Sequence, residues 1–499
     1  MERPEQPADS LDFDGDVGAL KRKSVRGGAV LGVLQLCQVF LQLAWTVAMA
    51  RLLRPEDFGL VAMAVPLVSL IGIIRDMGLA DAVLRRPRLT YAEMSNLYWV
   101  SLAIHVAAFC LFVAAAPLVG LFYGAPEVSW IVAAYSLLLL LNGVASLHVA
   151  LLTRRLQFAR VGLIKLVGFT VGAAAGVVVG LIWHTYWALV VMGLTVGLTE
   201  LLMAWLMSGW VPSRPHRGTN VRTMVDFGAN VGLSRLMNYA SSNADTVIVG
   251  KVLGAVALGF YDRAYRLMVT PTSLLLKPLE SVAPSIFSRL LDTPDVYRRS
   301  VLGAMGLVLM ATMPGMLFAV VMAPLLIPLA YGHGWDPVVP IFQAFGVAAV
   351  LRFQMVMLDW LFVVEGRSRA YRHWGVARAS VMIAGFAIGV NWGALGVAAS
   401  YAIAIALLLP VQAIWLGRTS PVRPADIGRS IVILVPGAGM AVSTMLWLVR
   451  ARPLPDWAAL ILALAASYGL VIAVAALFPS GRATMKGGIV TIREGLRRS

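Results

Sequence analysis

Long apolar segments separated by short polar or charged turns run through almost the whole chain. A transmembrane helix needs about 20 consecutive, mostly apolar residues. Because so many segments meet this length, the pattern predicts an all-α polytopic membrane protein with about 14 transmembrane helices. The predicted helices centre on residues 38, 66, 109, 140, 171, 198, 238, 268, 314, 350, 382, 404, 437 and 467.

The composition agrees with this pattern and excludes most soluble classes. The chain is 59% hydrophobic and 13% charged, whereas soluble domains have about 45–50% apolar and about 25% charged residues. Little sequence remains for a soluble catalytic domain or a nucleic-acid module. Cys37 and Cys110 lie within apolar segments without metal-ligand spacing, so we expect both to be buried as small apolar side chains.

The distribution of the 41 Lys and Arg residues predicts the orientation. If the N-terminus is cytoplasmic, 29 of them fall in cytoplasmic segments and five in external ones, as the positive-inside rule requires. Both termini are then cytoplasmic. The remaining seven lie within or near predicted helices: Lys165, Arg235, Arg263, Arg266, Lys277, Arg352 and Arg378.

Three weak matches in the same order indicate an internal repeat. Residues 50–64 align with 250–264, 116–124 with 323–332, and 154–165 with 367–378. The repeat predicts two pseudo-symmetric six-helix lobes around a central cavity, related by an axis along the membrane normal. In the third match Lys165 aligns with Arg378, so we expect these two residues to face each other across that axis.

The repeat also predicts the domain organisation. The expected parts are a disordered cytoplasmic tail, an N-terminal lobe, a C-terminal lobe, two additional transmembrane helices and a basic cytoplasmic tail. Their predicted ranges are 1–26, 27–211, 212–418, 419–480 and 481–499.

No enzyme signature is present in the sequence. The chain has no GxxxxGK[ST] phosphate-binding loop, and its six His residues show no pairing at metal-ligand spacing. The Asp-rich tract at 12–16 lies in the predicted tail. We therefore predict a transporter with no catalytic residues, no metal and no cofactor.

Ionisable residues inside the membrane carry the functional signal. Asp262 with Arg266 and Lys277 with Glu280 have helical pair spacing, and helix-locking pairs are an alternative to a substrate role. A cationic cavity selects an anion, and guanidinium groups bind phosphate in a forked geometry. The candidate substrate-binding residues are Arg235, Arg352, Lys165, Arg378 and Arg266.

Polar and acidic residues suggest two further roles. Asn238, Ser242 and Asn243 carry groups suited to sugar hydroxyls, although polar packing between helices explains them equally well. Glu200, Asp245 and Asp359 are candidates for coupling to an ion or proton, because a carboxyl group in a low dielectric gains a proton more easily.

Two tracts of the chain resemble a known family. The first is ARLLRPEDFGLVAMA, continuing to IIRDMGLADAVLRR, and the second is NADTVIVGKVLGAVALGFYDRAYRLMVTP. They resemble the polysaccharide transport family of the multidrug/oligosaccharidyl-lipid/polysaccharide exporter superfamily, the Wzx-type flippases. The pattern falls on Asn243, Asp245, Gly250, Lys251, Gly254, Leu258, Gly259, Tyr261, Ala264 and Tyr265.

The resemblance implies a specific activity. Such a flippase moves undecaprenyl-pyrophosphate-linked oligosaccharides across the bacterial inner membrane for exopolysaccharide, capsule or O-antigen synthesis, by alternating access. Its partners would be that lipid, the bilayer and a polysaccharide polymerase or chain-length complex, with no nucleic acid. The last two helices would form a groove for the lipid tail.

Two other functions remain open. A cation-coupled exporter of small cationic drugs from the same superfamily would have an acid-dominated cavity, which the seven basic and five acidic residues disfavour. A membrane polysaccharide polymerase or ligase would need a large external loop, and the longest predicted external loop has only about ten residues.

Overall fold

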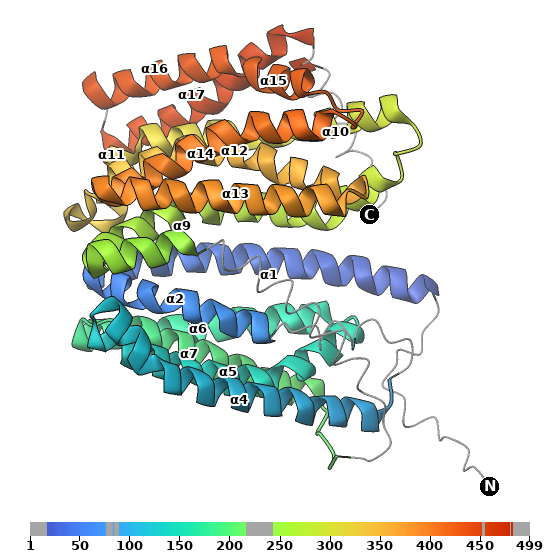
Figure 1. Cartoon of the computed structure of the whole chain (residues 1–499), viewed down its shortest axis with the longest axis vertical. Helices are drawn as coiled ribbons and strands as arrows, with labels where there is room; N and C mark the ends of the chain where they lie inside the picture. Colours follow the sequence, from blue (N-terminus) through green and yellow to red (C-terminus); the bar gives the residue numbers. More distant parts are fainter. Residues whose placement is uncertain are drawn as a thin grey trace. The chain divides into compact units, whose positions relative to one another are not determined.

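The structure is a computed structural model that describes residues 17–75, 83, 89–215, 243–451, 455–479 and 481–482. Its regular elements in these ranges are all helices (Figure 1). Eleven segments of the described part are long and apolar enough to cross a membrane. One of them, residues 368–417, contains two helices, α13 (Ser368–Gly389) and α14 (Gly393–Gly417). The all-helical membrane fold is therefore confirmed, while the count of 14 stays a prediction.

The predicted helix centres agree with the described helices. Each centre lies inside a helix except residue 238, which is outside the described residues. The chain divides into two compact units, residues 1–259 (unit 1) and residues 260–499 (unit 2). The predicted boundary between the two lobes, at residues 211/212, differs from the boundary between these units. The predicted lobes and cytoplasmic tails stay predictions.

Unit 1 is a bundle in which α6 and α7 form the most closely packed pair. Gly172 and Gly176 of α6 lie against Val196 and Ala188 of α7, at distances that leave little or no room for a side chain. Small residues allow membrane helices to approach closely. The helices wholly within this unit are α1 (Val17–Leu52), α2 (Pro55–Arg75), α4 (Tyr91–Tyr123), α5 (Pro126–Arg154), α6 (Phe158–Trp183) and α7 (Trp187–Ser208).

Unit 2 begins inside α9 (Ala244–Ser288) and contains the rest of the described helices. In it α12 and α13 both pack on α14, and α16 and α17 pair with each other and pack on α10. Besides α13 and α14, its elements are α10 (Pro294–Val321), α11 (Ala323–Tyr331), η2 (His333–Trp335), α12 (Val338–Val364), η3 (Val390–Trp392), α15 (Pro424–Val432), α16 (Val435–Ala451) and α17 (Asp456–Leu477).

Helix α9 is broken at Gly254, whose φ of 82° and ψ of −177° are not helical. Side-chain-bearing residues rarely adopt this conformation, so glycine is required here. The break lies 200 residues after Arg54, which together with Leu53 separates α1 from α2. In the first repeat match, which aligns residues 50–64 with 250–264, the helical conformation is therefore interrupted at equivalent positions in both copies.

Polar side chains join the ends of several helices in unit 2. Glu365, directly after α12, accepts hydrogen bonds from the Tyr297 hydroxyl of α10 at 2.9 Å and from Ser420 at 2.6 Å. Arg298 of α10 binds Asp426 of α15 through two bonds of 2.8 and 2.6 Å. These contacts fasten α12, α15 and the segment after α14 to α10.

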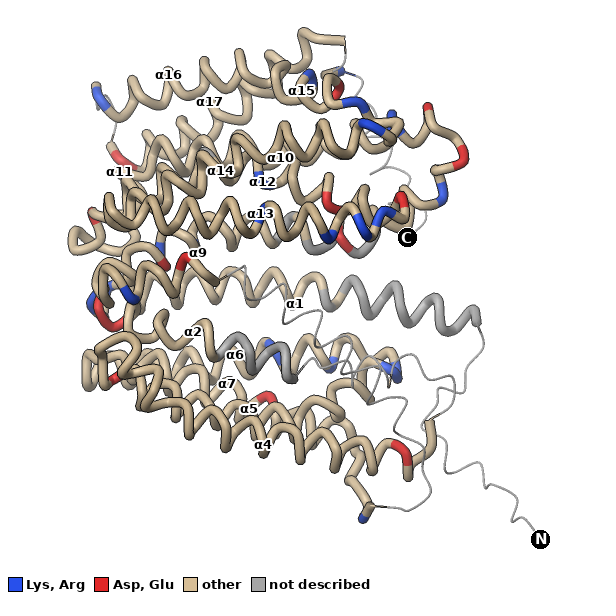
Figure 2. The backbone as a smooth tube through the Cα atoms, in the orientation of Figure 1, with Lys and Arg blue, Asp and Glu red and all other residues tan. Residues whose placement is uncertain are grey.

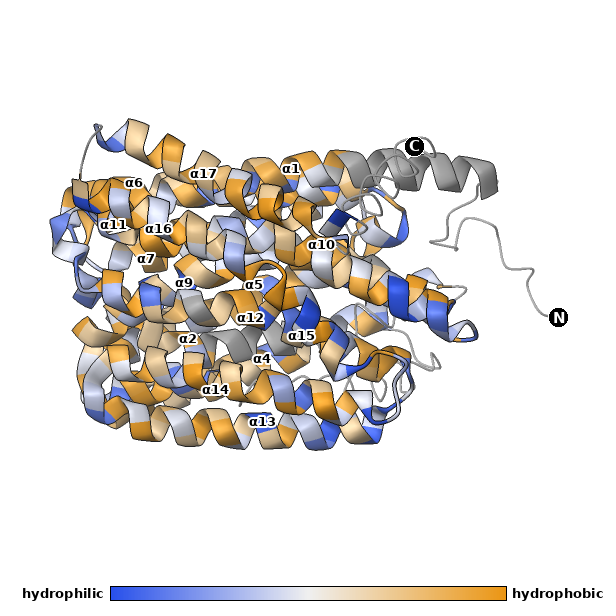
Figure 3. Ribbon diagram, turned by 90° about the horizontal axis from the view of Figure 1, so that it is seen from above, coloured by the Kyte–Doolittle hydropathy of each residue, from blue (hydrophilic) through white to orange (hydrophobic). Residues whose placement is uncertain are grey.

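The outward faces of the helices are largely apolar (Figure 3). Leu206 and Leu477 are 76% and 75% exposed, as expected for side chains that contact lipid. Cys37 and Cys110 are also exposed, so the expectation that both are buried was wrong. An apolar segment does not by itself show which of its side chains are buried. Lys and Arg gather mainly at one end of unit 2, whereas in unit 1 they lie at both ends of the bundle (Figure 2).

Candidate functional site

Arg352 lies in the middle of α12, and its guanidinium group reaches two neighbouring helices of unit 2. Its Nη1 donates to the Tyr401 hydroxyl of α14 at 2.9 Å and to the Tyr265 hydroxyl of α9 at 3.5 Å. Both partners are neutral phenols, so these bonds hold the side chain without neutralising its charge. Arg352 is thus a cation fixed inside an apolar bundle, where a charge is costly without a partner.

An aromatic cluster fixes the two phenols. The rings of Tyr261 and Tyr265, one helical turn apart on α9, stack at 6.5 Å. The buried Phe345 ring meets Tyr265 and Tyr401 edge-on, each at a centroid distance of 5.6 Å, and Phe386 stacks on Tyr401 at 6.3 Å. Such aromatic pairs contribute about 0.5–1.5 kcal/mol each beyond burial. The hydroxyl groups are therefore positioned before any substrate binds.

The residues of this site recur every seven positions along α12. Phe345, Arg352 and Asp359 therefore lie on nearly the same face, with an axial rise of about 10.5 Å from one to the next. This spacing is visible in the sequence. The sequence of the helix did not, however, indicate which residues contact Arg352 and Asp359. The aromatic residues Phe345, Phe386 and Tyr401 were missed for the same reason, whereas Tyr261 and Tyr265 belong to the pattern that carries the family resemblance.

Arg378 is paired with a carboxylate. Its Nη1 lies 2.7 Å from Oδ2 of Asp359, and the Gln412 side chain donates to Oδ1 of Asp359 at 2.8 Å. Helices α12, α13 and α14 each supply one member of this triad. The predicted substrate cation Arg378 and the predicted coupling carboxylate Asp359 thus neutralise each other, which sequence spacing did not indicate because 19 residues separate them.

Arg266 is paired as the helical spacing predicts. Its Nε lies 2.9 Å from Oδ2 of Asp262, one turn earlier on α9. Arg263 binds the same carboxylate at 2.5 Å, so one acid is shared by two guanidinium groups. The Arg266 side chain is 48% exposed. Asp262, Arg263 and Arg266 together therefore carry a net positive charge.

Lys165 and Glu200 lie in unit 1, on α6 and α7. Lys165 is exposed, whereas Glu200 is half-buried and packs against Gly168 of α6. A Cβ atom at Gly168 would lie 2.8 Å from Cγ of Glu200, so the missing side chain makes room for the acid. Whether Lys165 faces Arg378 concerns the placement of the two units and stays a prediction.

The predicted polar tract is only partly described. Arg235, Asn238 and Ser242 lie outside the described residues. Asn243 directly precedes α9, and its carbonyl oxygen accepts from the Val247 amide at 3.2 Å. Asp245, in the first turn of α9, is 5% exposed. Both residues make further interactions, so the roles proposed for them remain predictions.

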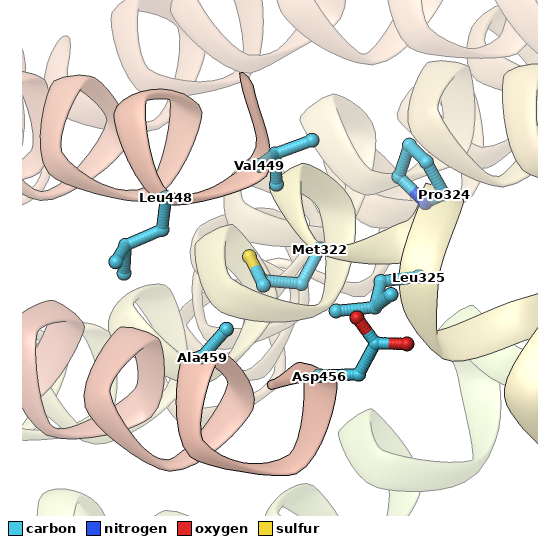
Figure 4. A pocket seen from close by; sticks show the side chains of 7 residues that line it. All are labelled: Met322, Pro324, Leu325, Leu448, Val449, Asp456 and Ala459. Carbon is cyan, nitrogen blue, oxygen red and sulfur yellow. The ribbon is translucent and has the colours of Figure 1, made fainter. Parts of the chain in front are cut away.

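Unit 2 also has a small cavity of about 40 Å³ at the ends of α11, α16 and α17 (Figure 4). Its lining is apolar except for Asp456. Ligand sites usually measure about 300–1,000 Å³, so this cavity is too small for an oligosaccharide. In the described ranges, no group of three His, Cys, Asp or Glu residues could hold a metal ion.

Comparison with known proteins gives related sequences over most of the chain. The "Lipopolysaccharide biosynthesis protein WzxC" of Escherichia coli (strain K12) is 22% identical over 76% of this chain and 78% of its own length. The "Teichuronic acid biosynthesis protein TuaB" of Bacillus subtilis (strain 168) is 23% identical over 60% and 63%. The "Succinoglycan biosynthesis transport protein ExoT" of Rhizobium meliloti (strain 1021) is 27% identical over 50% and 51%.

Solved structures share the fold. The "Lipid II flippase MurJ, inward closed conformation" superposes with a TM-score of 0.71, 12% identity, and coverage of 90% of this chain and 98% of that one. An inward-facing multidrug resistance MATE family transporter gives a TM-score of 0.58, 16% identity, and coverage of 80% and 99%. Residues 48–340, more than half of the chain, match the family described as "Polysaccharide biosynthesis protein". The chain therefore belongs to the polysaccharide biosynthesis protein family, in agreement with the family that two tracts of its sequence resemble.

Proposed function

We propose that this protein is a flippase that moves undecaprenyl-pyrophosphate-linked oligosaccharides across the bacterial inner membrane by alternating access. The family match and the relatives named for polysaccharide synthesis and transport support this proposal. The fold shared with a lipid II flippase supports a transporter rather than an enzyme. The product would enter exopolysaccharide, capsule or O-antigen synthesis.

The observation that carries the proposal is the state of Arg352. Arg266 and Arg378 each bind a carboxylate, whereas the described partners of Arg352 are two neutral hydroxyl groups. Its positive charge is therefore available to a pyrophosphate. Arginine suits this role because its planar group can bind two phosphate oxygens at once and does not lose its proton.

The other predicted residues have supporting roles in the proposal. Lys165 is an exposed cation of unit 1, and with Arg235 it stays a candidate for binding the same head group. Asn238, Ser242 and Asn243 would line the sugar path. Glu200 and Asp245 are the proposed coupling carboxylates, and Asp359 could act there only if its pair with Arg378 opens.

The alternative of a multidrug exporter has less support at this site. A cavity for cationic drugs would place acids toward the substrate, but Asp262 and Asp359 are both bound to arginines. The superposition with multidrug transporters concerns the fold alone. Unchanged drug resistance in cells that express the protein would support the flippase.

The test replaces Arg352 in cells that lack the chromosomal copy. Losing a hydrogen bond to a charged group costs about 1.5–3 kcal/mol, so Arg352→Ala should lower polymer export by about 10- to 100-fold. Arg352→Lys keeps the charge but loses the fork, and should retain part of the activity. Surface polymer and the undecaprenyl-linked intermediate are measured together.

Arg299→Ala is the matched control, because Arg299 is exposed on α10 and donates only within its own helix in the described contacts. This control should export normally. Arg352→Ala should accumulate the lipid-linked intermediate at an unchanged amount of membrane protein. Normal export by Arg352→Ala would refute the assignment of Arg352 to the substrate.

A further inference from the structure

In unit 1, α2 meets the first residues of α9 after its break, backbone against backbone. A Cβ atom added to Gly59 would lie 1.7 Å from the carbonyl oxygen of Ala255, and one added to Gly259 would lie 1.9 Å from that of Pro55. Real Cβ atoms essentially never come within 3.0 Å of another heavy atom. We call Pro55, Gly59, Ala255 and Gly259 the glycine crossing. While these residues are in contact, neither glycine can be replaced by a residue with a side chain.

The contact is reciprocal between equivalent residues of the repeat. Pro55 and Ala255 are 200 positions apart, and so are Gly59 and Gly259. Each glycine touches the residue that is equivalent to its own helix neighbour four positions earlier. A reciprocal contact of this kind is the property of a two-fold interface. The glycine crossing therefore joins two segments that the repeat alignment makes equivalent.

The part of α9 before the break is held to the rest of unit 1. The Lys251 ammonium group donates to the carbonyl oxygen of Phe122 at the end of α4 and lies 5.1 Å from the centre of the Phe122 ring. A Cβ atom at Gly250 would contact Tyr123 of α4 at 3.0 Å. The part after the break carries Ala255 and Gly259, and Gly254 alone connects the two parts.

The charges place the glycine crossing at the end predicted to be external. Arg51, Arg54 and Lys251 are three of the five basic residues on that side. The crossing consists of backbone and small side chains, so its separation breaks no ion pair within these four residues. Glycine contacts of this type depend on van der Waals packing and weak Cα–H···O bonds.

We propose that the glycine crossing is the external gate of the transporter, with Gly254 as its hinge. In the closed state the two equivalent glycines bring the first turns of two equivalent helices together. To open, the part of α9 after Gly254 swings away from α2, while Lys251 keeps the preceding part on α4. The transport step itself rests on the proposed function, whereas the closing and opening of this contact do not.

The test measures access from outside to a cysteine one turn further along α2. Ala62 is 2% exposed, so Ala62→Cys is placed in a chain in which Cys37 and Cys110 are replaced by alanine. Intact cells are treated with a membrane-impermeant maleimide. A side chain at Gly59 or Gly259 excludes the closed state, so Gly59→Ala and Gly259→Ala should each increase the labelling rate by about tenfold or more.

Two further variants separate the gate from general damage to packing. A Cβ atom at Gly254 meets open space but strains the backbone, so Gly254→Ala should also accelerate labelling. This variant tests the gate if Gly59→Ala and Gly259→Ala do not accumulate in the membrane. Gly303→Ala on α10, where a Cβ atom also meets open space, should label like the parent.

Equal labelling of the parent, Gly59→Ala, Gly259→Ala and Gly254→Ala would overturn the gate. Polymer export is measured in the same cells. If the three variants open the crossing but the parent flips no lipid-linked oligosaccharide, the gate stands and the proposed substrate falls. If the parent exports polymer and labelling does not change, the flippase stands and the gate falls.

Discussion

Opposite charges in unit 2 pair over two different distances along the chain. Asp262 and Arg266 are one helical turn apart, and this pair was predicted because the geometry of a helix alone brings such residues together. Asp359 and Arg378 lie on different helices, so their contact depends on how α12 packs against α13. For the same reason the phenols around Arg352 could not be predicted from the sequence.

We expect the triad of Asp359, Arg378 and Gln412 to stabilise unit 2. Asp359→Ala leaves the arginine without its carboxylate, and an unpaired buried polar group costs about 1–3 kcal/mol. The double variant Asp359→Ala/Arg378→Ala removes both charges and should unfold at a higher temperature than the single variant. Thermal unfolding of the purified protein in detergent measures this difference. An unchanged melting temperature of Asp359→Ala would contradict the structural role.

Among the elements, α17 is joined to α10 by two side-chain hydrogen bonds close to a proline of α10. Pro314 lies inside α10 and has no amide hydrogen to donate to the carbonyl oxygen four residues earlier. Tyr468 of α17 donates to the carbonyl oxygen of Ala311 at 2.9 Å, and Ser467 donates to that of Pro314 at 2.6 Å. The last two helices therefore support α10 rather than only lying beside it.

Removal of both hydroxyl groups should loosen α17. Hydrogen bonds between membrane helices contribute about 0.6 kcal/mol on average and about 1.7 at most, so Ser467→Ala/Tyr468→Phe should lower the free energy of unfolding by about 1–3 kcal/mol. Thr444→Ala is the control, because Thr444 donates only within α16 among the described contacts. A double variant as stable as the control would show that the two bonds contribute nothing.

At the level of the whole molecule, the apolar segments predicted the positions of the helices well. Hydrophobic segments of sufficient length have few alternatives to helices in a membrane. The short helix α15 before α16 was not predicted, because its polar face shortens the apolar segment. The break at Gly254 agrees with the prediction of two separate helices centred on residues 238 and 268, and the repeat alignment places Gly254 opposite Arg54.

The orientation follows from charge and can be measured directly. The positive-inside rule predicts that cysteines at His184 and Trp392, both exposed in short turns, react with an impermeant maleimide in intact cells. Cysteines at Arg160 and Thr419, also exposed, should react only after permeabilisation. The reverse pattern would place both termini outside. The parent for this experiment again lacks Cys37 and Cys110.

The reciprocal contact of the glycine crossing has a consequence for the origin of the chain. A homodimer of half-length chains would place the same glycine against a copy of its own helix on the dimer axis. One substitution in such an ancestor would have changed the contact twice. If such an ancestor was duplicated and fused, each side could then change alone, and Pro55 opposite Ala255 with glycine at both equivalent positions is the pattern that this history predicts.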